Sequence, residues 1–207
     1  MDEPEWLPLA RELQAIAQAG LAFTRDPYDQ QRFQRLRELA AHLLARGSDL
    51  PVEKILGLFA QERGYPTPKV DVRTAAFREG RILMVREASD GGWTLPGGWA
   101  DVNQSAAECA AREVAEESGF EVRILKLAAL WDFRRQGHVA RQPVSIYKAF
   151  FIGELTGGTP RPSVETTAVA FFAPDALPEL SAGRITARQI HRMFAHVAEP
   201  SLPTDFE

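Results

Sequence analysis

The chain of 207 residues contains a single cysteine, Cys109. An intrachain disulfide is therefore excluded, a cysteine-based zinc cluster is disfavoured, and a reducing compartment, by default the cytoplasm, is expected. No run of about 18 apolar residues occurs. The first residues carry Asp2, Glu3 and Glu5 in place of a basic leader followed by an apolar stretch. The sequence thus gives no indication of secretion or of membrane spanning.

An excess of positive charge is absent as well. The formal net charge is −4, so strong nonspecific attraction to nucleic acid is not expected. An anionic substrate would need help from a metal ion. The composition, with 45% hydrophobic and 25% charged residues, is that of a globular protein, and the chain is long enough for one sizeable core and a small second unit.

Apolar residues recur at three- and four-residue spacings through the first part of the chain, as in amphipathic helices. Two such helices and a shorter third at 52–63 are predicted. The segment 64–68 breaks the pattern, because proline restricts itself and the residue before it. We therefore predict a helical N-terminal domain at 1–65 and a second domain at 66–207. The positions that define the apolar faces are Leu9, Leu13, Ile16 and Ala17, then Phe33, Leu36, Leu39, Ala40, Leu43 and Leu44.

Two short amphipathic helices expose more apolar surface than they can bury against each other. We therefore expect the N-terminal domain to serve docking or dimerisation, and the protein to be a homodimer. The second domain contains segments rich in β-branched and aromatic residues, interrupted by two helical patterns. This alternation predicts a sheet covered on both faces, in the α/β or α+β class. The expected strands are 70–77, 82–86, 122–133, 144–152 and 166–172, and the expected helices are 106–118 and 186–197.

The helix expected at 106–118 has well-defined end signals. Ser105 and Glu108 have the spacing of a capping box, in which each side chain accepts from the backbone N–H of the other residue. Gly119 suits a left-handed position just beyond the last helical residue. The helix should therefore span about 13 residues, as counted between these two signals.

Three glutamates of this helix, Glu113, Glu116 and Glu117, lie at positions i, i+3 and i+4. Like charges at that spacing repel by roughly 0.2–0.5 kcal/mol per pair in an exposed helix. Arg112 or a divalent cation can relieve this repulsion, and clustered carboxylates suit Mg²⁺ or Mn²⁺ better than zinc. The preceding loop, 95–99, contains two glycines, so its backbone can approach a metal ion or phosphate closely. A plain charged helix surface is the alternative.

The whole pattern resembles the Nudix box of the Nudix hydrolases. One position departs from that box, because Gln104 stands where the family normally has glutamate. The resemblance implies an α/β/α sandwich with a mixed sheet for about residues 67–200, and hydrolysis of a nucleoside diphosphate linked to another moiety. The helical N-terminal unit and segments at 68–73 and 165–172 resemble the subgroup that carries a small all-α N-terminal domain, whose members act on CDP-choline-type or ADP-ribose-type diphosphates. The matching pattern is Gly98-x5-Gln104-x7-Arg112-Glu113-Val114-x-Glu116-Glu117-x-Gly119-Phe120.

The resemblance also implies roles for individual residues. The Gly97 carbonyl, Glu113 and Glu117 resemble the family's principal Mg²⁺ ligands, and Glu116 resembles a ligand to a further ion. Arg112 resembles the arginine that orients these carboxylates. The expected reaction is attack of water on one phosphorus, with metal ions neutralising charge in the transition state.

Other candidate residues lie outside the helix. Glu165, in a loop before an expected strand, is a candidate general base or added ligand, with Glu113 as the alternative base and an exposed loop acid as the alternative reading. Arg73 and Arg86 can hold phosphates, or be ordinary arginines of a sheet surface. His138, in the polar segment 134–142, can contact a base or ribose, or simply face solvent.

Two rival functions remain open from the sequence. One is removal of pyrophosphate from triphosphorylated RNA 5′ ends, which some Nudix enzymes perform. The other is a non-catalytic sensor or scaffold with a Nudix fold, for which Gln104 is the best sequence argument. The three intact glutamates of the helix favour an enzyme.

Overall fold

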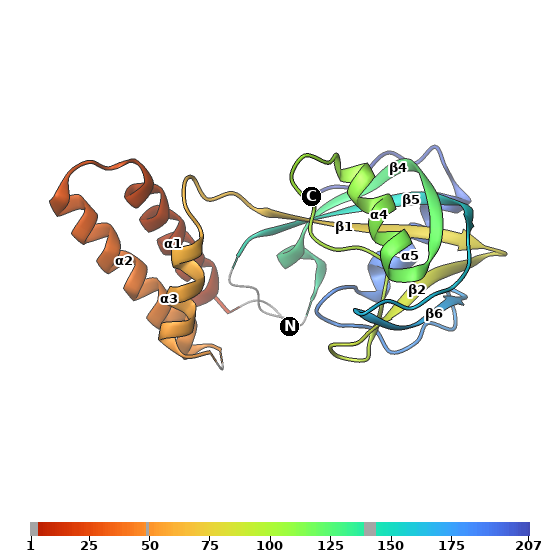
Figure 1. Ribbon diagram of the computed structural model, residues 1–207, viewed down its shortest axis with the longest axis horizontal. Coiled ribbons are helices and arrows are strands. Elements are labelled where there is room, and N and C mark those ends of the chain that lie inside the picture. The colour runs from red at the N-terminus through yellow and green to blue at the C-terminus, as the bar shows by residue number, and fades with distance from the viewer. Residues whose placement is uncertain (1–3, 49, 139–143) are drawn as a thin grey trace. The chain divides into compact units, whose positions relative to one another are not determined.

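A computed structural model describes residues 4–48, 50–138 and 144–207 of the chain (Figure 1). It divides into two compact units, the first running to Pro68 and the second formed by Lys69–Arg141 and Ile146–Glu207. None of the helices in the described ranges is both long enough and apolar enough to cross a membrane.

The first unit is a three-helix structure, as the apolar spacing predicts, with helices α1 (Trp6–Phe23), α2 (Pro27–Arg46) and α3 (Val52–Gln61). The start of α2 is fixed by Asp26, whose carboxylate accepts from the N–H groups of Tyr28 and Asp29. One small apolar core joins the three helices. Its buried members are Leu7, Ala10, Ala40, Ala41, Leu44, Ile55 and Phe59.

The second unit is built on a mixed six-stranded sheet. The strand order is β3-β2-β1-β5-β4, and β6 pairs with β2 away from this path. The pairing of β1 with β5 is parallel, whereas the other pairings are antiparallel. The strands are β1 (Lys69–Arg78), β2 (Arg81–Glu87), β3 (Trp93–Thr94), β4 (Phe120–Asp132), β5 (Ile146–Gly158) and β6 (Thr166–Phe172).

Two helices cover opposite faces of this sheet, α4 (Ala106–Ser118) and α5 (Ala187–Ala198). Cys109 and Ala110 of α4 pack against alternate residues of β1 and β5, including Val72 and Phe151. The intervening residues, such as Phe150, pack instead in the cluster that contains Ile190 and Met193 of α5. Because successive strand residues point to opposite faces, these contacts define three layers. The expected α/β/α sandwich is therefore confirmed.

Helix α4 begins and ends where its sequence signals predict. Both hydrogen bonds of the capping box between Ser105 and Glu108 form, and Gly119 adopts the left-handed conformation with φ 75°. The two-residue strand β3 was not predicted, because so short a segment shows no alternation of apolar and polar residues. A short 3-10 helix, Phe133–Gln136, occupies part of the expected polar segment, and residues 139–142 of that segment lie outside the described part.

Candidate active site

The glycine loop is held against β1 as an extra strand-like segment. Backbone amides of β1 donate to the carbonyls of Pro96 and Gly98 at 3.0 and 2.8 Å. Gly97, between them, directs its N–H away from β1 and donates to Oε2 of Glu117 at 2.9 Å. Its φ is +148°, and a Cβ there would lie 1.9 Å from a backbone oxygen of β1. Only glycine fits this position, which joins the loop to α4.

The carboxylates of Glu113 and Glu117 lie in a partly closed environment next to this loop. Glu117 is only 5% exposed, and burial raises its pKa to about 7. Burial also raises the pKa of Glu113, and a Cβ on Gly98 would lie 3.1 Å from one of its oxygens. A raised pKa means that neighbouring protein groups do not stabilise the negative charge enough to offset its removal from water. A bound cation would supply the missing compensation.

Arg112 is the centre of the polar network on the outer side of α4. Its guanidinium contacts Glu116 at 2.6 Å, Asp101 at 2.8 Å and Glu113 at 3.0 Å. Its Nε also donates to the Gln104 side-chain oxygen at 3.2 Å. The amide thus keeps a hydrogen bond to Arg112 at the position where the Nudix box has a carboxylate. Asp101, which the sequence did not single out, gives Arg112 a further negative partner.

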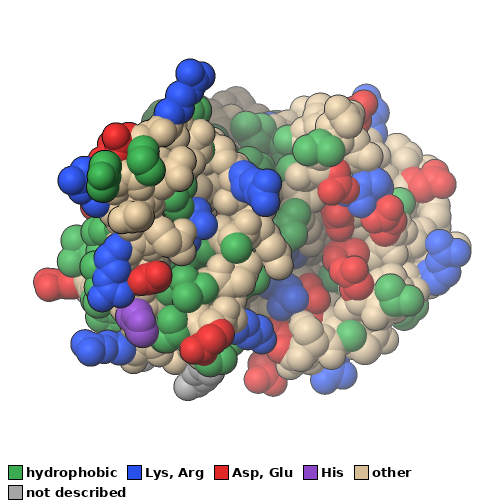
Figure 2. Space-filling model, turned by 60° about the vertical axis from the view of Figure 1, so that its left-hand side comes forward, with side chains coloured by type: hydrophobic (Ala, Val, Ile, Leu, Met, Phe, Trp, Pro, Cys, Tyr) green, Lys and Arg blue, Asp and Glu red, His purple; other side chains and the backbone are tan. Residues whose placement is uncertain are grey.

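The donors around the glycine loop are oxygen atoms, the ligands that Mg²⁺ prefers. Among the described residues, no group of three Asp, Glu, His or Cys side chains is arranged to bind a metal ion. Two of the glutamates of α4 have other partners, because Glu116 accepts a hydrogen bond from Arg112 and Glu117 accepts one from the Gly97 N–H. The chemistry of the set nevertheless fits Mg²⁺ or Mn²⁺, since two poorly compensated carboxylates face a loop open to close approach. Acidic side chains gather on the surface of this second unit, to the right in Figure 2.

Arg73 is part of a buried charged triad and not of an open phosphate-binding surface. Its guanidinium, in a residue only 4% exposed, makes two 2.9 Å hydrogen bonds to Asp71 and a third, of 3.1 Å, to the carbonyl of Leu95. Lys148 completes the triad with a 2.7 Å contact to Asp71, and burial lowers its pKa to about 8. These contacts place the guanidinium at the entry to the glycine loop, and the phosphate contact expected of Arg73 stays a prediction.

Glu165 lies at the surface of the loop before β6, and its neighbour ties that loop to α4. The Thr166 hydroxyl donates to the backbone oxygen of Glu117 at 2.7 Å. The Glu165 carbonyl accepts from Ala88 at 2.8 Å. The structure therefore brings this loop to the C-terminal turn of α4, although the sequence places the two segments about fifty residues apart.

Glu87 is a buried acid that the sequence reasoning missed. It ends β2, its pKa is raised by burial, and it contacts the guanidinium of Arg184 at 3.0 Å. Its charge influences Glu117, and the charge of Glu165 influences Glu87 in turn. The available signal was a carboxylate at the end of a strand whose central residues, 82–85, are apolar. The site therefore contains more negative charge than the helix alone indicates.

The two remaining candidate residues have different environments. Arg86 is exposed, and its Nε donates to the Gly91 carbonyl at 2.8 Å, closing the turn between β2 and β3. His138 does not face solvent, because its ring stacks on Phe133 at 4.1 Å and both ring nitrogens are buried. Burial lowers its pKa to about 4, so the imidazole is neutral at pH 7. Neither residue is brought against the carboxylates of α4 by a contact in the described residues.

Comparison with known proteins bears on this geometry. Residues 67–194 match the family described as NUDIX domain. The chain belongs to the Nudix hydrolase family. Residues 4–59 of this Nudix hydrolase match a second family, described as UDP-X-like, N-terminal oligomerisation domain. The N-terminal match lies within the first structural unit, whereas the NUDIX match begins at the end of that unit and covers most of the second.

Two of the similar proteins match this chain over nearly its whole length, and a third matches about two thirds of it. A Bacillus subtilis (strain 168) protein named "Putative ADP-ribose pyrophosphatase YjhB" is 42% identical over 99% of this chain and 98% of its own. The crystal structure of a UDP-X diphosphatase is similar over the whole of both chains, with 31% identity and a TM-score of 0.63. That of an ADP-ribose pyrophosphatase from Streptococcus suis covers 68% of this chain and all of its own, with 38% identity and a TM-score of 0.63.

These matches confirm the expected family, its fold and the expectation of an enzyme of the pyrophosphohydrolase class acting on nucleoside diphosphate derivatives. Nudix hydrolases in general use a divalent metal ion. The identity of the ion, the choice among substrates and the roles of the individual site residues stay predictions.

Proposed function

We propose that this Nudix hydrolase is a Mg²⁺-dependent enzyme of a reducing compartment, such as the cytoplasm, that cleaves the diphosphate of a nucleoside diphosphate sugar. ADP-ribose is the substrate we favour, because the 42% identical relative that spans nearly the whole chain carries that activity in its name. A UDP-linked compound is the second choice, from the similar UDP-X diphosphatase. The observation that carries the proposal is the buried carboxylate of Glu117 beside the partly buried carboxylate of Glu113, both next to the glycine loop.

In this proposal the glutamates of α4 and the Gly97 carbonyl hold the metal. Bound there, a divalent cation would lower the pKa of water and neutralise charge on the diphosphate. Arg112 positions Glu113 and Glu116 through its 3.0 and 2.6 Å contacts. Arg73 fixes the loop through the Leu95 carbonyl. Both arginines would therefore orient the groups that hold the metal ion. Such positioning supplies much of the rate enhancement in phosphoryl transfer, because the protein takes little part in covalent chemistry.

Glu165 is our choice for the general base that takes a proton from the attacking water. The hydrogen bond from Thr166 to the Glu117 backbone supports it, because this contact holds the Glu165 loop at the end of α4, and no ion pair engages the Glu165 side chain among the described residues. An exposed carboxylate in a loop can also reach a water that a bound substrate orients. Glu113 is the alternative base, and its partly buried position is the feature in its favour.

The substrate is tested with a panel of ADP-ribose, a UDP-sugar and CDP-choline, each incubated with Mg²⁺ and separated chromatographically. We expect release of a nucleoside monophosphate, with ADP-ribose giving the highest kcat/KM. Reaction in ¹⁸O-labelled water identifies the attacked phosphorus.

Two outcomes of the same panel contradict the proposal. Release of pyrophosphate from triphosphorylated RNA, with no turnover of the diphosphates, would favour the RNA-processing function. Ligand binding by calorimetry without turnover at any Mg²⁺ or Mn²⁺ concentration would favour a sensor.

We also propose that the protein is a homodimer formed through its first unit. The matched family is described as an oligomerisation domain. Leu9, Ile16 and Phe23 follow one another at seven-residue intervals along α1 and are all exposed, so they form a stripe on one side of that helix. Hydrophobic side chains are visible on this unit to the left in Figure 2. An exposed apolar stripe of this kind is typical of an interface with another chain.

A charge placed in the middle of the stripe should disrupt the dimer. We expect Ile16→Glu to shift the full-length protein from dimer to monomer in sedimentation velocity, because a buried unpaired carboxylate opposes association. The control is Leu125→Glu on β4, since Leu125 is 54% exposed and Ile16 is 47% exposed. If Ile16→Glu leaves the dimer intact, the α1 stripe is not the interface.

A further inference from the structure

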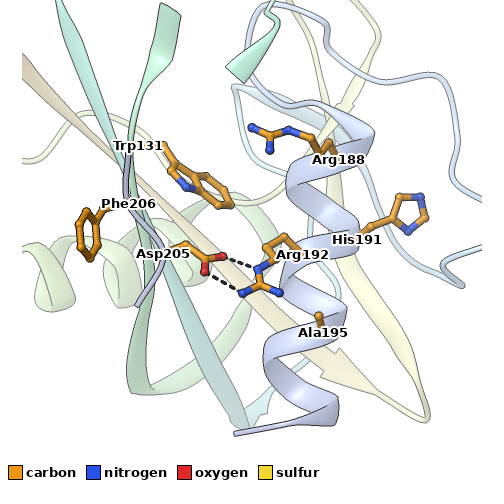
Figure 3. Close-up of a pocket in the computed structure, with 7 residues that line it drawn as sticks. All are labelled: Trp131, Arg188, His191, Arg192, Ala195, Asp205 and Phe206. Carbon is orange, nitrogen blue, oxygen red and sulfur yellow. Dashed lines mark hydrogen bonds and ion pairs between the residues drawn. The ribbon is translucent and has the colours of Figure 1, made fainter. Parts of the chain in front are cut away.

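Lys148 is a buried lysine on the sheet face that α5 covers. It pairs across the sheet with Trp131 of β4, and directly paired residues of neighbouring strands lie on the same face. Trp131 projects from that face toward α5 (Figure 3) and packs in the cluster that contains Met193 of this helix. Lys148 itself is only 2% exposed. Its influence on a bound substrate must therefore pass through its neighbours.

The contacts of Lys148 join it to the proposed catalytic site. Its Nζ donates to Oδ1 of Asp71 at 2.7 Å. Asp71 also accepts from Nε and Nη2 of Arg73, each at 2.9 Å. The third donor of Arg73, Nη1, is bonded to the carbonyl of Leu95, the first residue of the glycine loop. These hydrogen bonds form a continuous path from the interior of the sheet to that loop.

The triad of Asp71, Arg73 and Lys148 has one positive charge in excess. Lys148 is charged at pH 7, because its pKa, although lowered by burial, is about 8. Burial would raise the pKa of Asp71, but its two cations lower it, so the carboxylate is charged as well. Elsewhere on this face charges are matched, since Arg192 is bonded to the Asp205 carboxylate (Figure 3). Burying an unmatched charge is costly, and groups so strongly perturbed are concentrated at functional sites.

The other titratable groups that influence Lys148 in the described part of the chain are cationic or neutral. Arg73 on β1 and Arg184, in the segment before α5, are cations that lower the pKa of Lys148 further. His138, which follows the 3-10 helix, is neutral at pH 7, because burial and the charge of Lys148 lower its pKa to about 4. Asp71 is the acid that keeps the lysine charged.

The excess charge acts on the acids of the proposed catalytic site. Burial alone would lower the pKa of Arg73, but Asp71 and two acids outside the triad raise it. These two acids are Glu117 and Glu87. Glu87 already has a partner, because the Arg184 guanidinium contacts it at 3.0 Å. Once Glu117 serves a metal ion, the excess charge of the triad is left to an anionic group bound beside it.

We propose that Lys148 strengthens binding of the anionic diphosphate substrate, by giving the triad the extra positive charge that Arg73 presents to the catalytic site. The inference rests on the proposed function and adds to it a positioning residue that does not touch the substrate. A positive charge that acts on Glu117 favours a diphosphate but opposes a cation. Its removal should therefore weaken substrate binding without weakening metal binding, whereas a distorted site would weaken both.

The test compares Lys148→Met with Lys148→Arg in the full-length protein. We expect Lys148→Met to raise KM for the preferred diphosphate at least about 5-fold at neutral pH, with a smaller change in kcat, because one charge is lost from a poorly solvated region. Lys148→Arg keeps the charge and should keep KM close to that of the unaltered protein. In calorimetric titration with Mn²⁺ and no substrate, Lys148→Met should bind the ion at least as tightly as the unaltered protein does.

A pH series separates the charge of Lys148 from its packing. Lys148 is charged below its pKa of about 8 and neutral above it, so KM of the unaltered protein should rise between about pH 7 and pH 9. Arginine does not titrate in this range and methionine has no charge to lose, so neither variant should show this rise. A KM that stays constant in the unaltered protein, or rises equally in Lys148→Arg, overturns the inference whether or not Lys148→Met folds.

Lys126→Met is the matched control. It removes a lysine from β4, where the ammonium group donates to the Pro200 carbonyl and not to the triad, so KM should not change. Circular dichroism verifies that each variant is folded. A folded Lys148→Met with unchanged KM, or with metal and substrate affinity reduced alike, overturns the inference. If the unaltered protein turns over no diphosphate, the proposed function is contradicted and the inference fails with it.

Discussion

Replacement of Glu117 by Gln should lower turnover of the preferred diphosphate substrate by more than about 100-fold, since even loss of a partner one shell away from a metal commonly costs 10–100-fold. Glutamine keeps the shape of the side chain and an oxygen for the Gly97 N–H, 2.9 Å away in the structure. It removes the charge that a divalent cation needs. Because this carboxylate has a pKa of about 7 when no cation compensates it, its neutralisation should not harm folding.

The measurement is kcat at saturating Mg²⁺, followed by a titration of Mg²⁺ to determine the apparent metal affinity. Glu108→Gln is the matched control, because it changes an exposed glutamate of the same helix to a residue that also completes a capping box. It should keep close to full activity. Turnover by Glu117→Gln at the rate of the unaltered protein would remove Glu117 from the metal site.

Gly97→Ala is expected to have the largest effect on stability. The added Cβ would lie 1.9 Å from the Val72 carbonyl oxygen and 2.9 Å from the Arg73 Cα, and neither backbone atom can move without disturbing β1. The φ of +148° is also a conformation that L-residues rarely adopt. We expect a loss of roughly 3 kcal/mol or more in the free energy of unfolding, and a fall of roughly 6 °C or more in the melting temperature.

Gly98→Ala provides the comparison. A Cβ on Gly98 would meet the carboxylate of Glu113 at 3.1 Å, and that flexible side chain can turn aside. Its melting temperature, followed by circular dichroism, should stay near that of the unaltered protein, while activity falls because Glu113 is displaced. If Gly97→Ala melts no earlier than Gly98→Ala, the close approach of the loop to β1 is not required for folding.

The contacts of Arg112 could be predicted only in part from the sequence. From the sequence, Gln104 leaves the Nudix box one negative charge short. The structure keeps its oxygen on Arg112 and adds a 2.8 Å contact from Asp101 to the same guanidinium. Asp101 stands in a loop and follows no helical spacing from the glutamates, so only the folded chain shows that it reaches Arg112.

Arg73 and His138 make the same point for buried groups. Each is predicted as a substrate contact from its residue type and its place near strands or loops. In the structure Arg73 is hydrogen-bonded to Asp71 and the Leu95 carbonyl, and His138 is stacked on Phe133. Asp71 and Phe133 are near in the chain, but the burial of Arg73 depends also on Leu95, 22 residues away, and no local pattern reports burial.

The sequence by itself determined the features whose causes are local. The limits of α4 follow from Ser105, Glu108 and Gly119, and the spacing of Glu113 and Glu117 follows from the helical repeat. The same locality explains why the helical first unit and the main strands could be predicted. Tertiary structure alone decided that Gly97 meets Glu117, that the Glu165 loop joins the end of α4, and that Glu87 adds its buried charge. Those contacts join segments tens of residues apart, and their geometry depends on how the sheet and its two covering helices pack.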